Sequence, residues 1–94
     1  MNGQEPARAT AVIVNKRGLH ARASAKFVET AARFQCEVTV IKGDASVSGR
    51  SIMGLMMLAA SLGSAIELIA QGPDASEAVQ ALVALIAAKF HEDA

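Results

Sequence analysis

Residues 15–27 read NKRGLHARASAKF, and they place a histidine where a turn gives way to a helix. Gly18 favours a change of chain direction, whereas the residues from Ala21 onward favour helix. His20 is therefore predicted to lie at a helix N-terminus, where unpaired backbone N–H groups and the helix dipole stabilise an anion. The same field favours the neutral imidazole, which leaves a ring-nitrogen lone pair for nucleophilic attack. Such a histidine is suited to accepting a phosphoryl group.

Arg22 adds a second feature to this predicted anion site. Its planar guanidinium can donate two parallel hydrogen bonds to phosphate oxygens, which is a stronger contact than a neutral donor makes. The alternative is that His20 is a solvated surface residue, which is the commoner role of a single histidine near a helix start. These residues alone leave both interpretations open.

Length and composition predict one domain over residues 1–94, with residues 1–7 as a flexible N-terminal extension. Apolar residues make up 52% of the chain and are mostly aliphatic, so the core is expected to consist of many aliphatic contacts. The formal net charge is zero, and three Phe are the only aromatic residues. Nucleic-acid binding normally needs a basic surface and stacking aromatics, so this class of partner is excluded.

Cysteine and histidine content argues against a disulfide or a metal site. Cys36 is the only cysteine, and its place in an alternating apolar segment predicts a buried thiol. One cysteine and two histidines at unrelated spacings form no ligand cluster, so we expect neither a metal nor a cofactor. His91 lies in a polar tail and is expected to be solvated, without a role. The absence of a signal peptide or a long apolar segment predicts a cytoplasmic protein without membrane insertion.

The pattern of apolar residues predicts a single sheet with helices. Strands are expected at residues 8–14, 36–42, 45–48 and 65–71. Helices are expected after His20, over residues 51–62 with Gly63 as terminator, and after a capping box at residues 74–77. The order β-α-β-β-α-β-α predicts an α+β fold in which three helices cover one face of a four-stranded, mainly antiparallel sheet. The other face is expected to meet solvent.

The first helix is predicted to carry a solvated polar line opposite a broad apolar face. The polar line comprises Arg22, Lys26, Glu29 and Arg33. The apolar face comprises Ala25, Phe27, Val28, Ala31, Ala32 and Phe34. Helical spacing of this kind is typical of a helix that packs on a sheet.

Residues 50–62 read RSIMGLMMLAASL and predict a capped helix with methionines on its outer side. Ser51 can cap the helix N-terminus, while Ile52, Leu55 and either Leu58 or Ala59 fall at core-facing spacing. Exposed methionine forms an adaptable contact surface, so Met53, Met56 and Met57 are candidates for a docking patch. The alternative, that these methionines fill gaps in the core, stays open.

Two motifs in this order resemble one family, the HPr phosphocarrier proteins of the phosphoenolpyruvate-dependent phosphotransferase system (PTS). Gly18-Leu19-His20-Ala21-Arg22 is similar to the family's active-site signature, and Ser51-Ile52-Met53-Gly54-Leu55-Met56 resembles its regulatory-serine segment. The resemblance covers nearly all of the chain after the first few residues. It implies the HPr fold, an open-faced β-sandwich.

The resemblance implies a carrier that is phosphorylated by its partners and is not itself an enzyme. His20 would accept a phosphoryl group on Nδ1 from enzyme I and pass it to a histidine of an enzyme IIA protein, with Arg22 and Ala21 supporting the phosphate. Ser51 would be the target of an HPr kinase/phosphorylase, although it is also explained as a simple N-cap. The implied partner interface comprises Arg22, Met53, Leu55 and Met56, and a monomer is expected.

The sequence departs from the family pattern at two positions. Ala23 replaces the proline that usually follows the signature arginine, which keeps the helix but adds a backbone N–H. Met57 replaces a small polar residue and enlarges the apolar patch. Alternatives remain: a regulatory binding module of the same fold that carries no phosphate, a nitrogen-branch phosphocarrier acting mainly in regulation, and an unrelated small ligand-binding domain.

Overall fold

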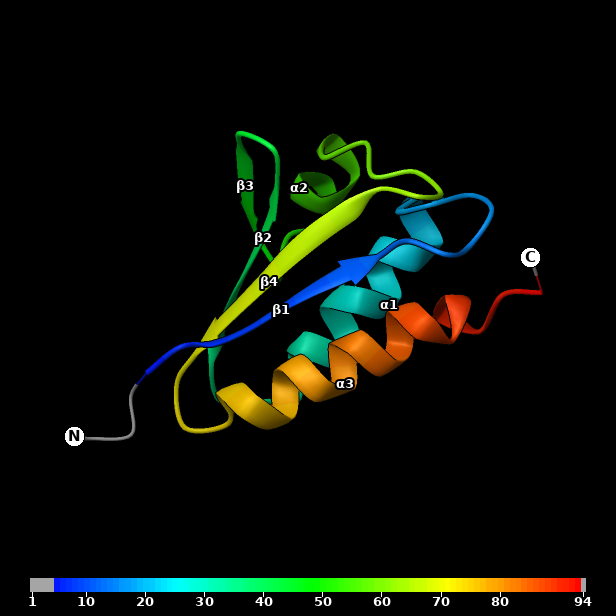
Figure 1. The fold of residues 1–94 in the computed structure, drawn as a ribbon. Coiled ribbons are helices and arrows are strands. Elements are labelled where there is room, and N and C mark those ends of the chain that lie inside the picture. The colour runs from blue at the N-terminus through cyan, green and yellow to red at the C-terminus, as the bar shows by residue number, and fades with distance from the viewer. Residues whose placement is uncertain (1–4, 94) are drawn as a thin grey trace.

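A computed structural model describes residues 5–93, and it confirms the predicted α+β architecture (Figure 1). The elements are β1 (Ala7–Val12), α1 (Ala21–Ala31), β2 (Glu37–Lys42), β3 (Ala45–Ser48), α2 (Ile52–Met57), β4 (Ala65–Gln71), α3 (Ala75–Ala87) and a short turn η1 (Lys89–His91). The predicted N-terminal extension needs a correction, because Ala7 already pairs in β1; residues 1–4 of that extension lie outside the described part.

The sheet has the order β1-β4-β2-β3, and every neighbouring pair is antiparallel. Figure 1 shows α1 and α3 packed side by side on one face of this sheet. Side chains alternate along the strands, so Val40 and Leu68, which are register partners, both point into the core. Exposed Glu37 and half-buried Thr39 and Glu67 alternate with the buried residues, as expected for a sheet with one open face.

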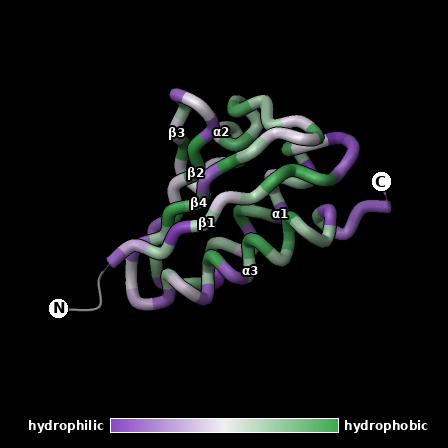
Figure 2. The backbone as a smooth tube through the Cα atoms, viewed as in Figure 1, coloured by the Kyte–Doolittle hydropathy of each residue, from purple (hydrophilic) through white to green (hydrophobic). Residues whose placement is uncertain are grey.

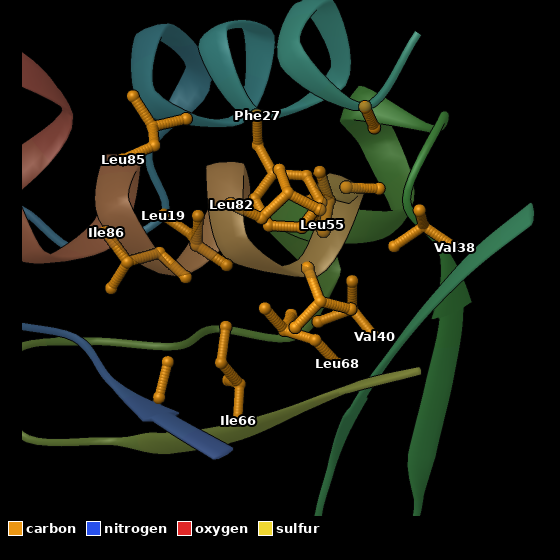
Figure 3. Packing of buried hydrophobic residues seen from close by; sticks show 14 of the residues in the cluster. Leu19, Phe27, Val38, Val40, Leu55, Ile66, Leu68, Leu82, Leu85 and Ile86 are labelled. Carbon is orange, nitrogen blue, oxygen red and sulfur yellow. The ribbon is translucent and has the colours of Figure 1, made fainter. Parts of the chain in front are cut away.

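The hydrophobic core lies between the sheet and the helices. Phe27 of α1, Leu55 of α2 and Leu82 of α3 converge above the strands in Figure 3, and all three are fully buried. Figure 2 shows hydrophobic stretches along α1 and α3, whereas the loop before α1 and the C-terminal segment are hydrophilic. The loop that leads to His20 therefore lies at a hydrophilic end of the molecule, beside a well-packed core.

The buried face of α1 differs from the predicted one. Ala25 and Ala32 are exposed, whereas Ser24 and Thr30 are buried. Ser24 is accommodated because its hydroxyl donates to the carbonyl of Leu19 at 3.2 Å, which satisfies the polar group inside. A count of apolar residues does not register a small hydroxyl residue that finds a local acceptor.

Lys26 is a second correction in α1, because it is half-buried and not part of a fully solvated line. Its Nζ donates a hydrogen bond to the carbonyl oxygen of Phe90 at 2.7 Å. The bond joins the first helix to the C-terminal turn, a contact over 64 positions of sequence. Local periodicity cannot indicate such a partner.

The second helix is shorter than predicted and ends at Met57, not at residue 62. Ala59 follows at a φ of 52°, so the chain leaves the helix before Gly63, which lies in a later turn. Leu55 and Leu58 are buried as predicted, but Ile52 is 41% exposed and does not face the core. A six-residue helix buries only part of one turn, which leaves Ile52 outside.

The predicted capping box at the start of α3 is wrong. Asp74 precedes the helix but makes no side-chain cap bond. Its carboxylate instead accepts a hydrogen bond from the backbone N–H of Gln35 at 2.8 Å, which ties the start of α3 to the loop between α1 and β2. A long-range acceptor therefore replaces the local one.

After α3 the chain forms a left-handed turn. Lys89, Phe90 and His91 have φ angles of 57°, 53° and 62°, a region that costs about 1–2 kcal/mol per residue without glycine. Phe90 is fully buried, and burial of such a side chain contributes about 1.5–3 kcal/mol. Hydrogen bonds from His91 N–H to Ala88 and from Glu92 N–H to Lys89, both 2.9 Å, close the turn. The C-terminal segment is thus directed back toward the loop before α1 (Figure 1).

Candidate functional site

His20 is the N-cap residue of α1, as the sequence predicted. Its backbone is extended, with φ −74° and ψ −178°, and its carbonyl accepts the first helical bond from Ser24 N–H at 2.8 Å. The His20 side chain makes no capping bond to the helix. The backbone N–H groups of residues 21–23 precede that first bond, so they form the positive end of the helix beside the imidazole.

The loop before His20 is fixed by its neighbours. Gly18 has a φ of 65°, and a Cβ at this position would lie 2.9 Å from the Cα of Ser61. Leu19 is buried, and its N–H donates to the carbonyl of Ala60 at 2.9 Å. The His20 loop therefore packs directly on the connection between α2 and β4.

Asn15 anchors the other end of this loop and is fully buried. Its Nδ2 donates to the carbonyl of Gly18 at 2.9 Å and to Oε1 of Glu92 at 3.1 Å. Asn15 thus joins the loop to the C-terminal segment. Its Oδ1 is buried without a hydrogen-bond partner within residues 5–93.

The imidazole of His20 contacts Glu92 directly. Nε2 of the ring is hydrogen-bonded to Oε2 of the carboxylate, and the side chains keep 16% and 14% of their exposure. Nδ1 makes no hydrogen bond to any residue in the described part of the chain. Burial opposes ionisation of Glu92, but hydrogen bonds from His20 and Asn15 and the charges of His20 and Arg17 outweigh it and lower the pKa of this carboxyl.

Two surface hollows meet at this site. A hollow of about 340 Å³ is lined by four cations together with His91, Glu92 and Asp93; the cations are Lys16, Arg17, Arg22 and Lys26. A second hollow of about 270 Å³ includes His20 together with Arg17, Met56 and Ala59. Arg17 lines both hollows, so it is the cation that connects the imidazole to the basic surface.

The residues predicted to form a partner interface are only partly brought together. Met56 lies beside His20 in the second hollow, and Met53 is 71% exposed on the same short helix. Arg22 is exposed in the first turn of α1 next to Ala21. Leu55 is fully buried and offers no surface to a partner, so its place in the predicted interface is corrected.

Met57 and Ala23, the two positions at which the sequence departs from the pattern of the resembled family, differ in exposure. Met57 is 79% exposed and extends the apolar patch that Met53 and Met56 form. Ala23 is fully buried in the first turn of α1, where it packs in the core. Alanine at this position therefore contributes a small buried side chain to the core.

Ser51 is the N-cap of α2, and its Oγ accepts a hydrogen bond from Gly54 N–H at 2.8 Å. The side chain is half-buried, and exposed Ile52 and Met53 follow it. The structure thus confirms the predicted cap and places the hydroxyl at the edge of the methionine patch.

Sequence reasoning missed three residues of this site: Asn15, Arg17 and Glu92. Asn15 and Arg17 stand in the quoted stretch before Gly18, where their proximity to His20 was the available signal. Glu92 lies 72 positions from His20 in a polar tail without periodicity, so no local pattern indicates it. Within residues 5–93 there is no group of three or more side chains that could hold a metal ion, and no helix long and apolar enough to cross a membrane.

Comparison with known proteins identifies the family. A family model described as the PTS HPr component phosphorylation site matches residues 7–88. The phosphocarrier protein HPr of Neisseria meningitidis is 58% identical over 80 residues, which cover 85% of this chain and 90% of that protein. The chain belongs to the HPr family of phosphocarrier proteins. The predicted resemblance is thereby confirmed.

Two further relatives agree with this assignment. The phosphocarrier protein NPr of Shewanella violacea is 44% identical over 80 residues, covering 85% of this chain and 88% of that protein. The crystal structure of HPr-C-His from Thermoanaerobacter tengcongensis has a TM-score of 0.89 and 45% identity, and the match covers 94% of this chain and 99% of that chain. The HPr open-faced β-sandwich is therefore confirmed. HPr proteins are phosphocarrier proteins of the PTS.

Proposed function

We propose that this chain carries a phosphoryl group on Nδ1 of His20, which it accepts from enzyme I and passes to a histidine of an enzyme IIA protein. The observation that carries the proposal is the position of His20 as N-cap of α1, with a partly exposed ring and no hydrogen bond on Nδ1 within residues 5–93. A phosphoryl group on that nitrogen would lie near the unpaired N–H groups of the first helical turn.

The charges around His20 also support the binding of a phosphoryl group there. Arg17 and Arg22 line the adjoining basic hollow, where a guanidinium can bind two phosphate oxygens at once. Ala21 supports the phosphate only through its backbone, because its N–H is one of those that precede the first helical bond. The chain needs no cofactor for this reaction, because the phosphoryl group comes attached to the donor protein.

The partner surface is proposed to consist of the His20 loop, Arg22 and the exposed methionines Met53 and Met56. Enzyme I and enzyme IIA proteins would dock there in turn, which requires brief and adaptable contacts. A monomeric protein in the cytoplasm is part of the same proposal, since each transfer exposes this one surface to successive partners.

Ser51 is proposed as a regulatory site for an HPr kinase/phosphorylase. Its hydroxyl lies at the N-terminus of α2, where added phosphate is tolerated by the helix, and it adjoins the methionine patch. A dianion beside this patch would disturb docking through its charge and its desolvation, without unfolding the domain. Ser51 also caps α2 through the bond from Gly54 N–H. We propose that it has both roles, as an N-cap and as a phosphorylation site.

The similarity to NPr supports the nitrogen-branch alternative. This chain is 44% identical to that NPr, however, and 58% identical to the Neisseria HPr. A regulatory module that carries no phosphate would not need a histidine beside a hollow lined by four cations. We therefore favour the general phosphocarrier and leave the nitrogen branch as the second candidate, to be decided by which enzyme IIA protein accepts the group.

The deciding experiment incubates the protein with enzyme I and labelled phosphoenolpyruvate. Wild type is expected to acquire acid-labile label, and His20→Ala none. The matched control is His91→Asn, because asparagine tolerates the left-handed φ of 62° at that position and the other histidine is thereby removed. Label that persists in His20→Ala, or that disappears only in His91→Asn, would refute the proposal.

Ser51 is tested separately with ATP and an HPr kinase. An acid-stable phosphate is expected in wild type and not in Ser51→Ala. Ser48→Ala, which removes a nearby exposed hydroxyl, is expected to remain a substrate. Equal labelling of Ser51→Ala and wild type would leave Ser51 as a cap alone.

A further inference from the structure

We propose that Glu92 is a positioning residue for His20: it holds the proton on Nε2 and thereby leaves the Nδ1 lone pair for the phosphoryl group. The inference deepens the proposed function and rests on it. It assigns a role to a carboxylate that lies 72 positions from the histidine and that no signature motif includes.

The tautomer follows from the chemistry of the two contacting atoms. An ionised carboxylate only accepts hydrogen bonds, so Nε2 must be the donor in its contact with Oε2. In a neutral imidazole the other nitrogen then carries the lone pair. The hydrogen bonds and the nearby charge of Arg17 that lower the pKa of Glu92 keep the carboxyl ionised near neutral pH. Nδ1 is therefore the nucleophilic nitrogen, and it is the one without a partner among the described residues.

Asn15 fixes the carboxylate so that it can orient the ring. Oε1 of Glu92 accepts from Nδ2 of Asn15 at 3.1 Å, while Oε2 faces the imidazole. The same amide nitrogen donates to the carbonyl of Gly18 at 2.9 Å, so Asn15 is itself held by the His20 loop. Each carboxylate oxygen thus has one defined partner, and the imidazole cannot rotate about Cβ–Cγ without breaking its bond.

The C-terminal turn brings Glu92 to this position. Fully buried Phe90 and the 2.7 Å bond from Lys26 to its carbonyl hold the left-handed turn at residues 89–91 against α1. Glu92 N–H then donates to the carbonyl of Lys89 at 2.9 Å, which closes the turn immediately before the carboxylate. Three successive residues with positive φ are unfavourable in themselves. Because the chain adopts them here, the carboxylate of Glu92 reaches the imidazole of His20.

The contact also suits the charge change during transfer. The Nδ1 lone pair forms the new N–P bond, and the bond between phosphorus and the donor breaks with its electron pair going to the donor. The proton on Nε2 stays in place, so the ring gains positive charge as the bond forms. A fixed carboxylate on Nε2–H stabilises that charge, just as a carboxylate behind a catalytic histidine does in hydrolases. In the onward transfer to the acceptor, the same steps run in reverse.

The first test is spectroscopic and needs no partner protein. Two-bond ¹H–¹⁵N correlation spectra of the neutral ring are expected to show the Nε2–H tautomer alone in wild type, and a mixture of both tautomers in Glu92→Ala. The matched control is Glu37→Ala, which removes an exposed carboxylate on β2, on the sheet and away from this site. Its spectrum is expected to equal that of wild type. A mixed tautomer in wild type, or no change in Glu92→Ala, would overturn the inference.

The second test measures the initial rate of phosphorylation by enzyme I and labelled phosphoenolpyruvate. Loss of a hydrogen bond to a charged group predicts a rate about tenfold lower for Glu92→Ala, with Glu37→Ala at the wild-type rate. Glu92→Ala that loses thermal stability but keeps both the single tautomer and the wild-type rate would make Glu92 a tether and overturn its positioning role. Failure of the proposed function is recognised independently, because His20→Ala would then still be labelled.

Discussion

The two helix N-termini that carry the candidate modification sites are built in opposite ways. Ser51 caps α2 with its own side chain, through a 2.8 Å bond from Gly54 three residues away. His20 caps α1 with its backbone alone, and its side chain is held by Glu92 from the other end of the chain. The Ser51 site is therefore formed by one short segment. The His20 site forms only when the loop at Asn15, the start of α1 and the C-terminal segment with Glu92 have come together.

This difference suits the two proposed reactions. A local cap keeps Ser51 in place as long as α2 exists, so a kinase can recognise a short segment. A histidine that both accepts and releases a phosphoryl group needs a defined ring orientation, because misplacement of reacting groups by about 1 Å can cost a hundredfold in rate. Long-range contacts supply such an orientation, and they also make it possible to disturb His20 without disturbing Ser51.

Phe90→Ala should have the largest effect, because it removes the side chain that holds the C-terminal turn. Phe90 is fully buried, and Phe→Ala in a core costs about 3–5 kcal/mol of unfolding free energy. Urea denaturation measures the loss. We also expect the His20–Glu92 contact to weaken while the Ser51 cap survives, as followed by amide chemical shifts of residues 21 and 54.

Phe34→Ala is the matched control, since Phe34 is only half-buried against the same core. Its loss of stability should be clearly smaller. If Phe90→Ala unfolds the domain altogether, Phe90→Leu provides a milder change in the same direction. Equal losses for the two alanine variants would contradict the role of Phe90 as anchor of the turn.

Gly18→Ala is expected to be the next largest change. The position has a φ of 65°, and an added Cβ would collide with the carbonyl oxygen of Ala60 and approach Ser61 Cα to 2.9 Å. Gly43→Ala is the matched control, with a φ of 59° and no atom within 4 Å of the added Cβ. Backbone strain alone predicts about 1 kcal/mol for Gly43, and the collision adds about 1–3 kcal/mol at Gly18. Thermal unfolding of both variants measures the difference.

Ser51→Ala is expected to cost about 1 kcal/mol, the usual value for loss of an N-cap side chain. Ser46→Ala, at an exposed position of β3, should change stability by less than about 0.5 kcal/mol. Because the cap is local, the tautomer and the phosphorylation rate of His20 should not change in Ser51→Ala. A large effect on His20 would show that the two sites are coupled through α2 and do not depend on separate contacts.

The parts of the fold that sequence could predict are those set by local rules. Alternation of apolar residues predicted strands at residues 36–42 and 65–71, and Val40 and Leu68 of these strands are buried. Ser51 was predicted to cap a helix, and its side chain does so. His20 at a helix start followed from the glycine before it and the helix formers after it. In each case the deciding partner lies within four residues or on the neighbouring strand.

The parts that sequence did not predict depend on partners far along the chain. Asp74 was expected to cap α3, but its carboxylate accepts a hydrogen bond from the N–H of Gln35 in the loop between α1 and β2. Lys26 was expected in solvent, yet the carbonyl of Phe90 binds it. Glu92 belongs to the same class, because only the folded C-terminal turn brings it to His20. Local propensity is overridden where tertiary contacts satisfy a polar group better than the local option does.

The smallest and most selective prediction concerns pH. The pKa of Glu92 is lowered from its ordinary value of 4.5, so its contacts stabilise the folded chain above that value and are lost as the pH falls through the lower native pKa. The ¹³Cδ shift of Glu92 should titrate with a midpoint below 4.5, and Asn15→Ala should move the midpoint upward by removing one of the two bonds. A midpoint above 4.5 in wild type would mean that desolvation prevails over these hydrogen bonds. Ser51 has no titrating group in this range, so acid should release the His20 tether while the α2 cap stays intact.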